Sequence, residues 1–263
     1  MISSDHADPF RQTHIANEPV TRGPTWWNGP IGGCGSVGGL NVTNVSAHVA
    51  LNKLRDGNQR FVSGNTKRST ALDQMRRNET IAEQKPYAIV LGCSDSRVPS
   101  EIIFDQGLGD LFVVRVAGNI AADSQVGSVE FAAERFGTRL VVVLGHSECG
   151  AVAAALEQAE FPTHSRSPYL DAIIDHLRPT VRALLKHDSQ PSPDELTKLA
   201  VRANIRTSVN HLTFGSEILA ELIEKDGLVI VGAEYSLRTG AVQFLDSRQE
   251  VGGRYVRLAV DNA

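Results

Sequence analysis

Two cysteines and one histidine provide the strongest chemical signal in this sequence of 263 residues. Cys93 begins the motif Cys-Ser-Asp-Ser-Arg-Val-Pro, and His146 and Cys149 belong to a later motif, Gly-His-Ser-Glu-Cys-Gly. Two thiolates and one imidazole make a Cys2His donor set, and a catalytic zinc ion uses three protein ligands when it keeps its fourth position open. The three side chains therefore predict a zinc site with room for a reactant.

The segments before these motifs explain how residues so far apart in the chain can meet. The apolar runs 87–91 and 140–144 are short, rich in β-branched residues and bounded by glycine, which predicts buried β-strands. Parallel strands end at the same edge of a sheet, where open α/β sheets bind ligands. A histidine and a cysteine three residues apart, as His146 and Cys149 are, can face one point where a strand leads into a helix. The helix N-terminus also favours the thiolate form of Cys149.

Asp95 and Arg97 form the second chemical element. Residues two apart on an extended segment lie on the same side, so the guanidinium can bind the carboxylate through two hydrogen bonds. An ordinary structural ion pair is one interpretation. Beside a metal, Arg97 would hold Asp95 away so that water fills the fourth position, whereas a released Asp95 would become the fourth ligand.

The chain beyond these motifs alternates predicted helices and strands, which indicates an α/β fold. We expect a mainly parallel central sheet of four strands plus an antiparallel edge strand, flanked by helices, with an N-terminal helical arm. The expected strands are 87–91, 111–116, 140–144, 228–235 and 241–245. The expected helices begin near Ser46 and then cover 69–84, a short segment after Pro99, 124–136, 147–159, 168–186, 192–212 and 216–225. In the second helix, Leu72, Met75 and Ile81 are expected to face inward.

Residues 1–45 differ from the rest, and we expect the zinc-binding domain to cover 46–263. The first segment holds turn-forming residues, the pair Trp26 and Trp27, and a glycine-rich run that resists regular structure. This composition indicates a flexible extension. A docking segment for a partner chain or a shell is the alternative, because paired exposed aromatic residues tend to mark contacts.

Composition narrows the class of protein. A net charge of −4 and the lack of a basic stripe argue against a nucleic-acid partner. No apolar run reaches the roughly 18–20 residues of a membrane span, and the N-terminus lacks the features of a secretory signal. We therefore expect a cytoplasmic protein with no membrane partner, recruited elsewhere only if residues 1–45 dock. Three cysteines are too few for a disulfide framework, which favours metal-binding thiols.

Taken together, the motifs resemble those of the β-class carbonic anhydrases over roughly 49–245, including Gly-Asn-Gln-Arg-Phe at 57–61 and Phe-Val-Val-Arg at 112–115. The resemblance implies one zinc ion per chain bound by Cys93, His146 and Cys149, with Asp95 and Arg97 gating the fourth position. It implies reversible hydration of CO2 to bicarbonate and a proton by zinc-bound hydroxide. It also implies a homodimer or a larger homo-oligomer with active sites at the subunit interface.

The resemblance further implies substrate-binding residues, some of them supplied across that interface. They are Gln84, Phe112, Ala117, Phe131 and Gly150. Because two thiolates cancel the formal charge of zinc, hydration is expected to rise above about pH 7–8.

Two other functions remain open at this point. The same zinc site could hydrolyse carbon disulfide or carbonyl sulfide, which are linear like CO2. The chain could also be a zinc-stabilised scaffold or cargo protein docked through residues 1–45, although a structural zinc normally has four firm protein ligands.

Overall fold

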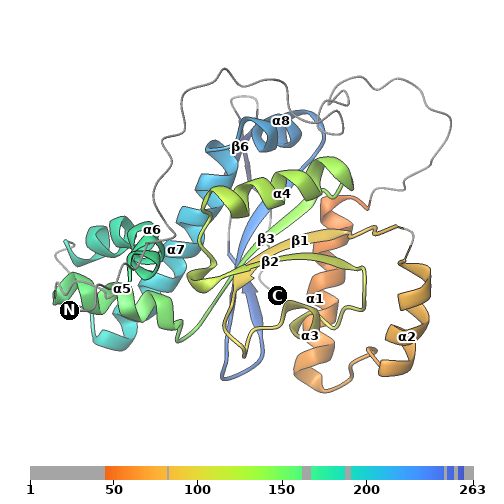
Figure 1. The fold of residues 1–263 in the computed structure, drawn as a ribbon, viewed down its shortest axis with the longest axis horizontal. Coiled ribbons are helices and arrows are strands. Elements are labelled where there is room, and N and C mark those ends of the chain that lie inside the picture. Colours follow the sequence, from red (N-terminus) through yellow and green to blue (C-terminus); the bar gives the residue numbers. More distant parts are fainter. Residues whose placement is uncertain are drawn as a thin grey trace, which may run out of the picture. The chain divides into compact units, whose positions relative to one another are not determined.

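The computed structural model describes residues 45–81, 83–161, 167–186, 191–245, 248–251 and 254–257 (Figure 1). Its centre is a five-stranded sheet in the order β2-β1-β3-β4-β5. The strands are β1 (Ala88–Cys93), β2 (Leu111–Val116), β3 (Leu140–His146), β4 (Val229–Tyr235) and β5 (Val242–Phe244). The first four are parallel and β5 is antiparallel to β4, so the predicted α/β fold is confirmed. A separate antiparallel pair, β6 (Arg248–Val251) and β7 (Arg254–Arg257), was not predicted.

The helices also follow the predicted pattern, with shifted ends. They are α1 (Ala47–Ser63), α2 (Thr70–Glu79), α3 (Ser100–Ile103), α4 (Asp123–Arg135), α5 (Gly150–Glu160), α6 (Pro168–Leu185), α7 (Pro193–Phe214) and α8 (Glu217–Lys225), with a 3-10 turn η1 (Ala117–Asn119). Ser46 caps α1 by accepting a hydrogen bond from the Val49 amide, and Ser192 and Glu195 form a capping box at α7. Within the described ranges, no helix combines the length and the apolarity that crossing a membrane requires. The predicted extension at 1–45 lies outside the described residues, apart from its last residue.

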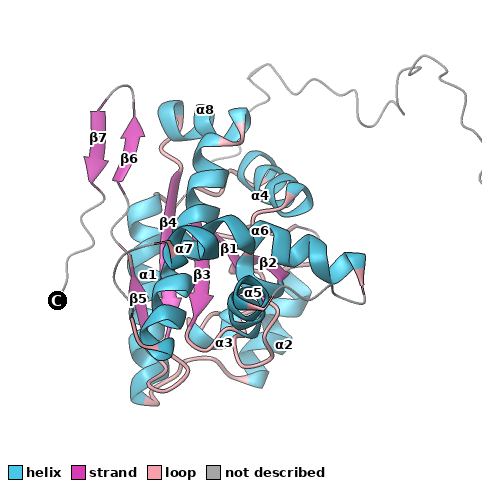
Figure 2. Ribbon diagram, turned by 90° about the vertical axis from the view of Figure 1, so that its left-hand side faces the viewer, coloured by secondary structure: helices cyan, strands magenta, loops and turns pink. Residues whose placement is uncertain are grey.

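Helices cover both faces of the sheet (Figures 1 and 2). Side chains alternate between faces along a strand, so Ile89 and Leu91 of β1 belong to one hydrophobic core with residues of α4, α5, α6, α7 and α8, while Val90 belongs to another with residues of α1 and α3. Burial on both faces explains why the strands are continuously apolar instead of alternating. The ends of β1 and β3 are consequently held in place by two hydrophobic cores.

The prediction that the apolar residues of segment 69–84 face inward is wrong for the single chain. Leu72, Met75 and Ile81 are 49%, 64% and 78% exposed. Polar contacts hold this helix, because Arg76 forms two hydrogen bonds of 2.6 Å with Asp110. The helix also ends at Glu79, earlier than predicted. The periodicity therefore identified an apolar face correctly, but it did not show that this face is exposed in the single chain.

Candidate metal centre

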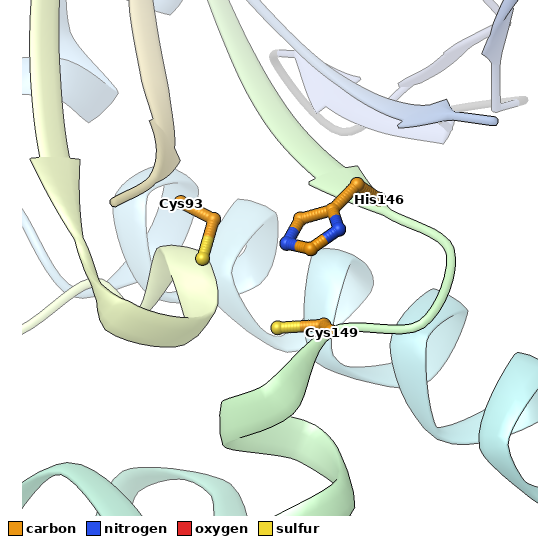
Figure 3. Close-up of side chains that lie close together, drawn as sticks. All are labelled: Cys93, His146 and Cys149. Atoms are coloured by element: carbon orange, nitrogen blue, oxygen red, sulfur yellow. The ribbon is translucent and has the colours of Figure 1, made fainter. Parts of the chain in front are cut away.

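Cys93, His146 and Cys149 meet at one edge of the sheet, and we call them the Cys–His–Cys cluster. Cys93 ends β1, His146 ends the neighbouring strand β3, and Cys149 immediately precedes α5. Their donor atoms all lie within 4.8 Å of one another, and the two sulfur atoms and the imidazole ring border one common space (Figure 3). All three side chains are buried. The cluster could hold one metal ion.

One nitrogen of His146 is free to act as a donor atom. Nδ1 lies 2.9 Å from the carbonyl oxygen of Ser147. Because a carbonyl oxygen only accepts hydrogen bonds, Nδ1 carries a proton, and in the neutral imidazole Nε2 then carries the lone pair. Nε2 is buried and has no hydrogen-bond partner among the described residues. An unpaired buried polar atom costs about 1–3 kcal/mol, which a metal bond would offset.

The two thiols of the cluster are coupled. A hydrogen bond with Cys149 lowers the pKa of Cys93 to about 4, and the amide of Gly118, 3.3 Å from Cys93 Sγ, also contributes. The same contact raises the pKa of Cys149, and it outweighs the amides of Ala151 and Val152 at the start of α5. Without a metal, the two thiols therefore share one proton through the hydrogen bond that joins them. A divalent cation would favour deprotonation of both.

Asp95 lies beside the cluster and is bound by Arg97. The Arg97 side chain donates from Nε to Oδ1 at 3.0 Å and from Nη2 to Oδ2 at 2.8 Å, and its backbone amide donates to Oδ1 at 2.9 Å. These contacts, above all the side-chain hydrogen bond, hold the pKa of Asp95 well below its usual range. Oδ2 lies 3.9 Å from Nε2 of His146. The carboxylate is thus ionised, close to the cluster and turned toward Arg97.

The turn that follows Cys93 is fixed by a contact that motif spacing did not predict. Arg115 of β2 donates from Nε to the carbonyl oxygen of Cys93 at 3.1 Å and from Nη2 to that of Asp95 at 2.7 Å. Arg115 stands opposite Gly92 in the pairing of β1 with β2. Only knowledge of that pairing could have indicated this role.

Two of the five residues implied for substrate binding lie beside the cluster. Ala117 directly follows β2, whose last residue, Val116, pairs with Cys93. Gly150 is the first residue of α5 and directly follows Cys149. Both therefore lie at the sheet edge that carries the cluster.

The other three implied residues lie toward the opposite ends of the strands, where β1 and β2 begin. Phe112 pairs with Ile89 near the start of β1. The run from Phe112 to Val116 spans about 13 Å along β2. The Phe112 ring centroid is 6.4 Å from that of Phe131, which is 54% exposed. Gln84 is exposed and precedes β1. A single chain therefore does not bring these three residues to the cluster.

Comparison with known proteins gives consistent matches. The family model described as "Carbonic anhydrase" matches residues 88–242. Carbonic anhydrase 2 of Mycobacterium tuberculosis (strain H37Rv) is 37% identical over 212 residues, which cover 80% of this chain and 99% of that protein. The structure of the β-carbonic anhydrase CcaA aligns with a TM-score of 0.62 and 26% identity, covering 79% of this chain and 91% of that chain. The structure of the β-carbonic anhydrase CafA of Aspergillus fumigatus aligns with a TM-score of 0.60 and 28% identity, covering 68% and 86%.

Proposed function

The chain belongs to the β-carbonic anhydrase family, and from this premise we propose that it catalyses the reversible hydration of carbon dioxide to bicarbonate and a proton. In this proposal the reaction takes place at a zinc ion bound by Cys93, His146 and Cys149. The observation that carries the proposal is the buried Nε2 of His146, which lies close to both sulfur atoms and has no hydrogen-bond partner in the described part of the chain.

The donor set fits zinc in both chemistry and number. Zinc binds thiolate sulfur and imidazole nitrogen, and three protein ligands are typical of sites that keep a position for a reactant. The hydrogen bond from Nδ1 of His146 to the Ser147 carbonyl is the outer contact that metal-bound histidines usually make. When bound, zinc would act as a Lewis acid that makes water nucleophilic near neutral pH.

Asp95 and Arg97 prepare the open position, in this proposal. Arg97 occupies both carboxylate oxygens, so Asp95 does not act as a fourth donor. At 3.9 Å from Nε2 of His146, the carboxylate is still close enough to accept a hydrogen bond from a hydroxyl group in that position. The low pKa of Asp95 keeps it an acceptor across the neutral range. Its role is therefore to orient the reactant.

A second copy of the chain would complete the site. CO2 is apolar, and the implied apolar residues Phe112 and Phe131 lie away from the cluster of their own chain. Phe131 is 54% exposed, and β2 is an edge strand of the sheet. The exposed apolar residues of α2, including Met75, would be covered in the same assembly. We therefore propose a homodimer in which Phe112, Phe131 and Gln84 of one copy face the cluster of the other.

The function is tested by stopped-flow CO2 hydration from about pH 6.5 to 9, with zinc measured on the same sample. We expect about one zinc ion per chain and a rate that rises through about pH 7–8, since that is the range in which zinc makes water acidic. Asp95 does not contribute to this rise, because its lowered pKa lies far below the range. Zinc-loaded protein that hydrolyses carbonyl sulfide but does not hydrate CO2 would refute the proposed substrate.

The shared pocket is tested by sedimentation at the protein concentrations used for kinetics. We expect a dimer or a larger assembly, with turnover per chain falling on dilution below the dissociation constant, because activity then follows assembly by mass action. A monomer that retains full turnover per chain would show that one copy is sufficient, and the dimeric site would be wrong.

A further inference from the structure

Two polar side chains of α7 are buried beside the turn η1 and have no part in the proposed reaction. Asn204 and Ser208 are each 3% exposed. Residues four apart lie on the same face of a helix, so both point in one direction. Buried polar groups are nearly always hydrogen-bonded, and their partners therefore indicate what they hold in place.

Both side chains bind the backbone of η1. Asn204 donates from Nδ2 to the carbonyl oxygen of Gly118 at 2.7 Å. Ser208 donates from Oγ to the carbonyl oxygen of Asn119 at 3.0 Å. Gly118 and Asn119 are themselves buried, so α7 satisfies two buried acceptors in consecutive residues.

The turn held in this way contacts the cluster directly. The amide of Gly118 donates to Cys93 Sγ at 3.3 Å. Gly118 and Asn119 have φ angles of 73° and 44°, in the left-handed region that is uncommon for residues other than glycine. Such a conformation persists when its surroundings determine it. The hydrogen bonds from α7 provide that constraint.

The same helix also packs against the strand that carries His146. A Cβ atom at Gly145, or one at Gly232 of β4, would lie 2.6 Å from Ile205 of α7. The absence of these side chains lets α7 sit directly on the backbone of β3 and β4. One helix therefore contacts both the turn beside Cys93 and the residue before His146.

We propose that Asn204 and Ser208 are positioning residues for Cys93, which they control by aiming the Gly118 amide at its sulfur atom. The inference rests on the proposed function, since it treats Cys93 as a metal ligand. Hydrogen bonds to a metal-bound sulfur orient it and adjust its electron density. Loss of such outer contacts typically weakens metal binding by about 10–100-fold.

The test compares the full-length variants Ser208→Ala and Asn204→Leu with the wild type. Zinc transfer to the chelator 4-(2-pyridylazo)resorcinol gives the rate of metal loss, and Co2+ substitution gives the sulfur-to-cobalt absorption bands. We expect metal loss to accelerate by about 10–100-fold and the cobalt bands to shift, because Cys93 loses its fixed orientation.

Two matched variants distinguish an effect on the orientation of Cys93 from a general loss of protein stability. Thr213→Val removes another buried α7 hydroxyl, whose hydrogen bond within the described structure goes to the Val209 carbonyl of the same helix, so it should leave metal loss and spectrum unchanged. Ser208→Thr keeps the hydroxyl and should behave as wild type. If Ser208→Ala lowers the melting temperature but leaves both metal readouts unchanged, the inference is wrong. If Asn204→Leu fails to fold, Ser208→Ala decides alone.

The proposed function and this inference fail in different ways. A wild type that binds zinc without hydrating CO2 would refute the function, yet the metal readouts of Ser208→Ala would still decide the inference. A wild type that binds neither zinc nor Co2+ would overturn the metal site and the inference together.

Discussion

Replacing Cys149 with alanine is expected to abolish zinc binding and to reduce CO2 hydration at least about a thousandfold, because water without the metal is far too weak an acid to react at neutral pH. The variant keeps only two of the three clustered donor atoms. The buried position, 1% exposed, leaves little room for solvent to replace the lost sulfur. Zinc content by mass spectrometry and stopped-flow hydration measure the two effects on one sample.

The fold should tolerate this substitution, which makes the loss interpretable. Cys149 precedes α5 without a side-chain capping bond in the described structure, so alanine removes no cap. Val181→Ala provides the control, since Val181 is equally buried in the same core but carries no donor atom. This control should lose stability yet keep zinc and activity. A Cys149→Ala protein with a full zinc complement and normal turnover would refute the ligand assignment.

The sequence could predict the location of the site because that location depends on local patterns. The runs before Cys93 and His146 read as buried strands, and adjacent parallel strands bring their ends together whatever the length of chain between them. The three-residue step to Cys149 then follows from the entry into α5. Donor identity and strand ends were sufficient to predict that the three side chains meet.

The remaining features depend on contacts that no local pattern encodes. Asn204 binds Gly118 across a long stretch of chain, and nothing near either residue indicates the pairing. The titration of Cys93 and that of Cys149 are coupled by the hydrogen bond between the two thiols, which joins residues far apart in the chain. The exposed Met75 shows a further limit, because the partner of an apolar face can lie on another chain. The long-range hydrogen bonds, the coupling of the two thiols and the exposed apolar face could therefore be identified only from the structure.

Replacing Arg97 with leucine is expected to leave zinc bound but to lower CO2 hydration by about a hundredfold, because the group that orients the reactant loses its support. Arg97 supplies both side-chain hydrogen bonds to Asp95, at 3.0 and 2.8 Å. While bound to Arg97 the carboxylate already lies 3.9 Å from Nε2 of His146, so once released it would compete for the open position. The cobalt spectrum should then change toward four protein ligands. The hydration rate of Arg97→Lys should lie between those of the wild type and Arg97→Leu, since lysine keeps the positive charge but cannot reproduce the paired hydrogen bonds.

A double variant tests whether Arg97→Leu loses activity because Asp95 occupies the open position. Asp95→Ala combined with Arg97→Leu removes the competing carboxylate, so it should restore part of the activity that Arg97→Leu loses. Arg178→Leu breaks a surface ion pair with Asp175 on α6 and should change neither readout. Without Arg97, the pKa of Asp95 rises from its lowered value toward the ordinary value near 4, so the group stays ionised from about pH 6 to 9. Protonation of Asp95 therefore adds no pH dependence in that range, and the deficit of Arg97→Leu should shrink as the pH rises, because hydroxide competes better than water with the carboxylate for the open position. A double variant no more active than the single one, with an unchanged cobalt spectrum, would mean that Asp95 does not close the site.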